Sequence, residues 1–137
     1  MKDSDETAEL YNDSLMRCLR DQDFIKKFYT RFFAADPDIR RLFATTNMQQ
    51  QEDMLKASLF MIMLSSTSPA ASDQYLSHTA LTHNHRHIPA HLYDIWLECL
   101  IETVADVDTK FDESLETAWR TTMQVGVNYM KSRNALS

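Results

Sequence analysis

The sequence predicts an all-α protein, and three observations support this. Its 137 residues suffice for one hydrophobic core. It contains one glycine and three prolines, too few for the many tight turns of a sheet-rich fold. Apolar residues recur at helical spacing along most of its length. We therefore expect six or seven helices in a single domain over residues 1–137, with residues 1–4 as a flexible N-terminus.

The first half of the chain predicts four helices, over residues 5–20, 23–35, 37–43 and 48–64. The second of these carries a broad aromatic stripe, formed by Phe24, Ile25, Phe28, Tyr29, Phe32 and Phe33. Asp36 is a suitable cap for the third helix, because Pro37 fits the first helical position. Thr46 or Asn47 is suited to cap the fourth.

The second half predicts helices over residues 73–83, 90–105 and 112–131. A loop containing Pro69 precedes them, and Ile88-Pro89 breaks the chain because a residue before proline avoids the α region. The helix over residues 90–105 has the most regular apolar face, formed by Leu92, Ile95, Trp96, Cys99, Leu100 and Val104. Helices of such unequal length favour steep crossings around a pocket over a simple four-helix bundle.

Charge and hydropathy exclude several functions. The net charge is −6 without a long basic run, which disfavours nucleic acids and anionic membranes as partners. Residues 1–9 are acidic rather than apolar, so we expect no signal peptide. The longest apolar run, residues 59–64, is too short to span a membrane. We expect a cytoplasmic protein in which Cys18 and Cys99 are buried free thiols.

All five histidines lie within residues 78–91. Local composition leaves three interpretations open. In the first, one histidine is an axial iron ligand. In the second, His83, His85 and His87 together bind zinc or another metal. In the third, most of the histidines are solvated loop residues. The alternating triplet has poor geometry for a closed zinc site, and no cysteine lies nearby as a further ligand.

Four motifs then occur in a recognisable order: Phe28-Tyr29, the short helix ending at Phe43, Gln51 four residues before Leu55, and His83 before Ile88-Pro89. With this order the chain resembles the globin family, in particular bacterial single-domain globins and the globin part of flavohaemoglobins. The stretch FYTRFFAADPDIRRLF is similar to their second and third helices, and QEDML to the start of their distal helix. The resemblance runs from about residue 24 to residue 129, and implies a globin fold around one haem b.

The resemblance assigns His83 as the proximal iron ligand, five residues before Ile88 and ten before Tyr93. Such a ligand is a neutral imidazole whose second nitrogen is held by an acceptor. His78 and His85 are the alternatives if the register of this loop differs.

On the opposite face the resemblance assigns four residues. Phe43 packs flat on the porphyrin. Tyr29 donates a hydrogen bond to the bound gas, and Leu55 shapes the cavity. Gln51 guards the entrance, and its amide can donate to the gas or to Tyr29. A core tyrosine and an exposed helix glutamine are the alternatives for the two polar residues. Further lining, equally compatible with ordinary core, is formed by Phe28, Phe33, Leu59, Ile88, Trp96, Leu100 and Met123.

Two departures bear on function. Tyr93 fits the flavohaemoglobin tyrosine that polarises the proximal histidine, but Met130 stands where those proteins have glutamate. The sequence ends at Ser137 without a flavin or nicotinamide domain, so we expect no self-sufficient NO dioxygenase. The leading hypothesis is reversible binding of O2, with NO and CO as other ligands, by a monomer or homodimer. The alternatives are an NO dioxygenase with an external reductase, a haem-based gas sensor acting on a signalling partner, and a non-haem metal-binding or structural helical domain.

Overall fold

The computed structural model describes residues 2–64 and 90–136, with side chains described for residues 6–63, 90–124 and 127. This part of the chain forms six helices and contains no strand. They are α1 (Lys2–Leu19), α2 (Phe24–Ala35), α3 (Pro37–Leu42), α4 (Met48–Leu64), α6 (His91–Val107) and α7 (Glu113–Leu136). The all-α prediction is confirmed. The helix predicted over residues 73–83, the preceding loop and the break at Ile88-Pro89 lie outside the described residues.

Helix ends agree best with the prediction where a capping side chain is present. The Asp36 carboxylate accepts a hydrogen bond from the Asp38 amide at 2.9 Å, with Pro37 in the first turn. Asn47 likewise accepts from the Gln50 amide at 3.1 Å, and Asp112 from the Leu115 amide at 2.9 Å.

Two helix ends differ from the prediction by several residues. Helix α1 begins at Lys2, three residues earlier than expected, and α7 continues to Leu136, five residues beyond the predicted end. Neither stretch contains a proline or glycine, so nothing in the local sequence stops the helix there.

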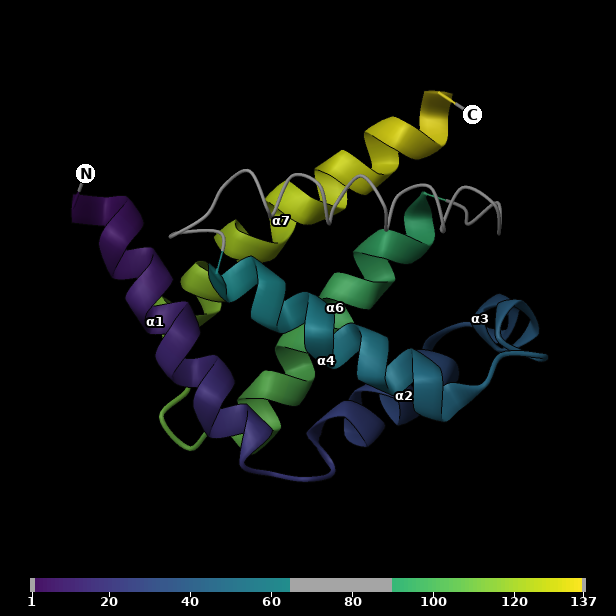
Figure 1. Ribbon diagram of the computed structural model, residues 1–137, viewed down its shortest axis with the longest axis horizontal. Coiled ribbons are helices and arrows are strands. Elements are labelled where there is room, and N and C mark those ends of the chain that lie inside the picture. The colour runs from purple at the N-terminus through teal and green to yellow at the C-terminus, as the bar shows by residue number, and fades with distance from the viewer. Residues whose placement is uncertain (1, 65–89, 137) are drawn as a thin grey trace.

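The helices cross around a common centre (Figure 1). Helices α6 and α7 run in opposite directions and pack on each other, α1 packs against α7, and α2 packs against α6. Helix α4 crosses in front of α6 in this view, and its first turns lie close to α2 and α3.

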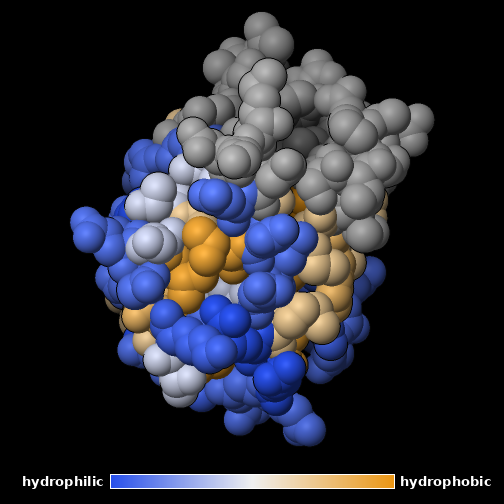
Figure 2. Space-filling model, turned by 90° about the vertical axis from the view of Figure 1, so that its left-hand side faces the viewer, coloured by the Kyte–Doolittle hydropathy of each residue, from blue (hydrophilic) through white to orange (hydrophobic). Residues whose placement is uncertain are grey.

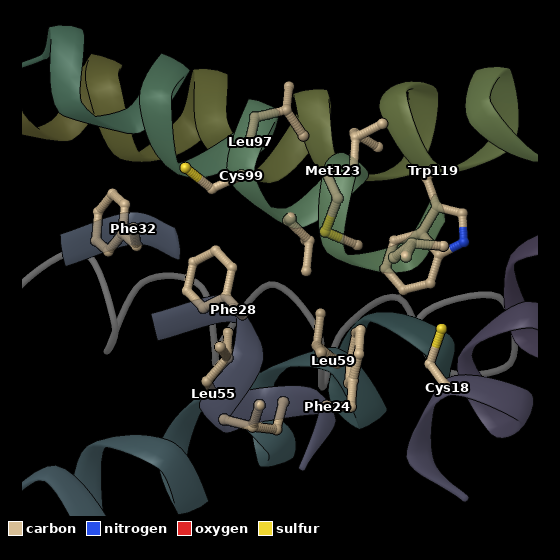
Figure 3. Close-up of a cluster of buried hydrophobic side chains, with 14 of the residues drawn as sticks. Cys18, Phe24, Phe28, Phe32, Leu55, Leu59, Leu97, Cys99, Trp119 and Met123 are labelled. Atoms are coloured by element: carbon tan, nitrogen blue, oxygen red, sulfur yellow. The ribbon is translucent and has the colours of Figure 1, made fainter. Parts of the chain in front are cut away.

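The core lies where these layers meet. Figure 3 shows Leu97, Cys99, Met123 and Trp119 from α6 and α7 facing Phe24, Phe28, Leu55 and Leu59 from α2 and α4. Most of these side chains are almost completely buried. Each buried side chain of this size stabilises the fold by about 1.5–3 kcal/mol, so this cluster accounts for much of the stability. Both cysteines are buried free thiols, as predicted.

A polar network lies at the corner formed by the turn between α6 and α7. The Asp108 carboxylate, fully buried, accepts hydrogen bonds from Ser14 Oγ at 2.6 Å, from Arg17 Nε at 2.7 Å and Nη2 at 3.0 Å, and from the Lys110 amide at 3.0 Å. Trp119 Nε1 donates to Ser14 Oγ at 2.9 Å. The network therefore ties α1 and α7 to the turn that follows α6. We refer to Ser14, Arg17, Asp108 and Trp119 as the corner network.

The face that carries α1 is mostly hydrophilic, with a smaller hydrophobic area between the polar side chains (Figure 2). The large apolar side chains that are exposed in the described part are Leu10, Met16 and Met54. Within the described residues, none of the helices combines the length and the apolar character that a membrane crossing requires.

Candidate functional site

The candidate site is built on the aromatic stripe of α2. Because the stripe is broad, its residues point in different directions around the helix. Phe28 is fully buried beneath α6 and contacts Trp96 edge-on, with ring centroids 5.9 Å apart. Tyr29 and Phe33 lie on the side that faces the end of α3. The stripe thus contributes both to the core and to a second aromatic group at its edge, and Tyr29 and Phe32 belong to both.

Phe43 is the centre of that second group. It directly follows α3, and its amide donates to the Ile39 carbonyl oxygen at 3.2 Å, which fixes the backbone there. Its ring centroid lies 6.3 Å from that of Tyr29, 5.7 Å from that of Phe33 and 6.3 Å from that of Phe32. Phe43 itself is only partly buried. Its ring is therefore held against three aromatic rings of α2 and stays partly exposed.

Gln51 approaches Tyr29 from α4. Its side-chain amide donates to the phenol oxygen of Tyr29 at 3.3 Å. In this bond the phenol oxygen accepts through one of its lone pairs. Leu55 follows one turn later on α4 and is 6% exposed. The first half of α4 therefore brings one polar and one apolar side chain toward α2, in the predicted order.

The remaining predicted lining residues are divided between core and rim. Leu59, Leu100 and Met123 are fully buried members of the core cluster, so their packing is accounted for without a ligand. Trp96 and Phe33 are only partly buried and pack against that cluster. A role of these five residues as pocket lining stays a prediction.

The predicted proximal side falls largely on residues that the structure does not describe. His78, His83, His85, His87 and Ile88 lie outside the described residues, as does the side chain of Met130. Among the described residues no group of three or more potential ligands is arranged to hold a metal ion. The fifth histidine, His91 at the start of α6, is exposed, with Nε2 4.0 Å from Asp36 Oδ2.

Tyr93 is the described residue of the proximal prediction. It lies in the first turn of α6 and is 7% exposed, with its hydroxyl oxygen buried. Burial raises its pKa to about 12. Tyr93 is thus a neutral phenol over the physiological pH range, able to donate a hydrogen bond.

Sequence reasoning missed two contributors to this site. Phe32 contacts Phe43 although it was expected only as part of the stripe. Lys26 Nζ and Glu52 Oε1 form an ion pair at 2.9 Å, which joins α2 to α4. The sequence positions of Lys26 and Glu52 could have predicted this ion pair. Lys26 precedes Tyr29 by three residues, and Glu52 directly follows Gln51.

Comparison with known proteins identifies the family. Residues 26–130 match the family model described as Globin, which covers most of the chain. A Pseudomonas aeruginosa protein, described as structurally highly homologous to a human haemoglobin, is 32% identical with a TM-score of 0.87. That match covers 93% of this chain and 98% of the other. The chain therefore belongs to the globin family, and membership in this family implies a haem cofactor.

A bacterial globin from Campylobacter jejuni supports the fold alone. It is 19% identical, with a TM-score of 0.78, and the match covers 96% of this chain and 97% of that one. No curated protein sequence matches the chain. The more specific likeness to flavohaemoglobins stays a prediction.

Proposed function

We propose that this globin binds haem b through His83 and reversibly binds O2 on the opposite face, with NO and CO as further ligands. The observation that carries the proposal is the hydrogen bond from Gln51 to Tyr29 beside the ring of Phe43. A donor pair within an otherwise aromatic and aliphatic group suits a polar diatomic gas held over an apolar macrocycle.

The described residues fit such a cofactor by the chemistry of their side chains. Phe43 offers a partly exposed aromatic ring, which suits contact with a planar porphyrin. Leu55, with the buried rings of α2, provides an apolar boundary that excludes water. Haem iron, when bound, supplies the position at which the gas binds.

Tyr29 and Gln51 then act on the gas. Because Gln51 donates to the phenol oxygen, the phenol is oriented and its O–H is directed away from Gln51. When O2 is bound, the O–H would donate a hydrogen bond to its partly negative oxygen. In an apolar setting this bond is stronger than it would be in water, so it slows release of the gas.

Ligand binding is favoured over catalysis by the proximal residues. Tyr93 is placed in the chain where flavohaemoglobins have the tyrosine that polarises their proximal histidine, and its buried phenol stays neutral. Met130, placed where those proteins have glutamate, supplies no negative charge. A weakly polarised histidine is suited to holding O2 rather than to driving its reaction with NO.

The first experiment tests haem binding. The purified protein should be red, with an intense absorption band near the violet edge of the spectrum. His83→Ala should abolish or greatly weaken haem uptake, whereas the matched surface variant His91→Ala should bind haem like the wild type. A protein that stays colourless after addition of haemin would overturn the proposal.

The second experiment tests the gas-binding role of Tyr29. Tyr29→Phe should accelerate O2 dissociation by ~10-fold or more, because it removes a hydrogen bond to a partly charged acceptor. Tyr11→Phe is the control, since it also removes a buried hydroxyl but one that bonds to the Leu59 carbonyl. An unchanged dissociation rate in Tyr29→Phe would refute the distal role.

A further inference from the structure

Two polar contacts join α2 to α4, and they lie side by side. The inner contact is the hydrogen bond from Gln51 to Tyr29 at 3.3 Å. The outer contact is the ion pair between Lys26 Nζ and Glu52 Oε1 at 2.9 Å. Lys26 lies one helical turn before Tyr29 on α2, and Glu52 is the neighbour of Gln51 on α4. The ion pair therefore spans the same helix contact as the distal hydrogen bond.

The two partners differ in exposure. The Glu52 side chain is 16% exposed, whereas that of Lys26 is 57% exposed. The carboxylate is thus largely covered on α4, and the lysine reaches over to it from the solvent side of α2. The hydrogen bond from Lys26 to Glu52 also raises the pKa of Lys26, since it stabilises the charged ammonium. The pair lies at the solvent-facing edge of the contact between α2 and α4.

We propose that the Lys26–Glu52 ion pair is a latch that holds the first turns of α4 on α2 and so positions Gln51 against Tyr29. This inference rests on the proposed function, since it assigns the latch to the path by which gas enters and leaves the distal side. Lys26 and Glu52 are positioning residues: they act through Gln51 and make no contact with the gas themselves. Opening the latch lets the start of α4 move outward and withdraws the Gln51 amide from the phenol.

The latch should respond to salt concentration, which a purely apolar packing contact would not do. The ammonium of Lys26 is exposed, so salt ions screen its attraction to Glu52, with a Debye length of about 10 Å at 0.1 M ionic strength and about 3 Å at 1 M. An ion pair at the surface also contributes little to global stability, because water competes for its exposed partner. Local opening at α4 should therefore depend on salt while the global unfolding transition hardly moves.

The experiment compares gas kinetics in the haem-loaded full chain at about 20 mM and about 1 M salt. In Lys26→Gln and in Glu52→Gln, CO entry and O2 dissociation should both be about threefold faster than in the wild type at low salt. At high salt the wild type should approach the variants. Lys26→Arg, which keeps the charge, should restore wild-type rates.

Lys27→Gln is the matched control. Lys27 is the next residue, has similar exposure, and pairs with Asp21 in the α1–α2 turn rather than with α4. It should leave the gas kinetics unchanged. The latch would be overturned if Lys27→Gln and Lys26→Gln changed the gas kinetics equally. It would also be overturned if Lys26→Gln had wild-type rates at low salt.

A haem-independent measurement separates this inference from the proposed function. Amide hydrogen exchange in the haem-free chain should be faster over residues 51–55 in Lys26→Gln than in Lys27→Gln. If the chain binds haem and CO but exchange and kinetics are the same in both variants, the latch is wrong and the proposed function stands. If exchange differs but no haem binds, the helix contact is confirmed and its role in gas binding is refuted.

Discussion

The corner network and the distal site hold different helices together, and they do so by opposite means. At the corner, one buried carboxylate accepts four hydrogen bonds, all at 3.0 Å or less. At the distal site, a hydrogen bond of 3.3 Å, the Lys26–Glu52 ion pair at the surface and a group of buried and partly buried rings connect α2, α3 and α4. The polar groups at the corner are bonded to one another within the protein, whereas we propose that those of the distal side act on a bound gas.

Because of this difference, we expect stability and gas binding to depend on different regions of the molecule. Regions with buried, fully bonded groups open only with global unfolding, while regions with few and exposed bonds open locally. We therefore expect substitutions at the corner to change the free energy of unfolding with little effect on gas kinetics. Substitutions at the distal site should do the reverse.

The largest expected effect is that of Asp108→Ala. Removing this carboxylate deprives the partly buried Arg17 guanidinium and the fully buried Ser14 hydroxyl of this acceptor, which should cost about 3 kcal/mol of unfolding free energy. Denaturant titration measures this cost. O2 dissociation should stay unchanged.

The matched control for this variant is Asp106→Ala. Asp106 lies two residues earlier in the chain and pairs with Arg31, but its side chain is 60% exposed. Its removal should cost at most about 1 kcal/mol. Similar losses in the two variants would show that the corner network contributes no more than a surface pair.

A second, smaller effect at the corner is its dependence on acid. Burial of Asp108 would raise its pKa, but the hydrogen bonds from Arg17, Ser14 and the Lys110 amide outweigh burial and hold the pKa below its ordinary value. A carboxyl whose pKa is lower in the folded state stabilises the fold above the unfolded pKa. This contribution is lost as the pH falls below the unfolded pKa, which is about 4, and through the lower pKa of the folded state.

Asp108→Asn should therefore flatten the fall in unfolding free energy with acid. Denaturant titrations between about pH 5 and pH 2 measure this slope. Asp21, whose pKa is lowered by its hydrogen bond from Lys27, lies in an exposed pair, so Asp21→Asn should flatten the slope less. Parallel curves for Asp108→Asn and the wild type would contradict the assigned role.

The same two regions differ in how far the sequence predicts them. Local signals predict the elements of the distal site: the stripe on α2, the Asp36 and Asn47 caps, and the order of Phe43, Gln51 and Leu55. The family resemblance then predicts that Gln51 can donate to Tyr29, and this contact is present. Each of these features depends on residues close in the chain or on a pattern shared with a family.

The corner network was not predicted, because its partners are far apart in sequence. Asp108 meets Ser14 and Arg17, more than 90 residues away, and Ser14 meets Trp119 across 105 residues. Helical periodicity can indicate which positions face inward, but it does not indicate which polar groups meet. One part of the network is local in sequence, namely the hydrogen bond from the Lys110 amide to Asp108. The sequence could have predicted this bond, because an aspartate that accepts from the amide two residues later is typical of a turn.

The smallest expected effect is at the distal site, in Gln51→Leu. The leucine cannot donate to the Tyr29 oxygen, so the phenol is less well oriented and O2 dissociation should rise about threefold, less than in Tyr29→Phe. The free energy of unfolding should stay within about 0.5 kcal/mol of the wild type. Displacement of O2 by CO in a stopped-flow instrument measures the rate. Gln49→Leu removes an amide on the same helix that bonds to Asp53 instead, so an equal acceleration there would show that Gln51 acts through the helix and not through Tyr29.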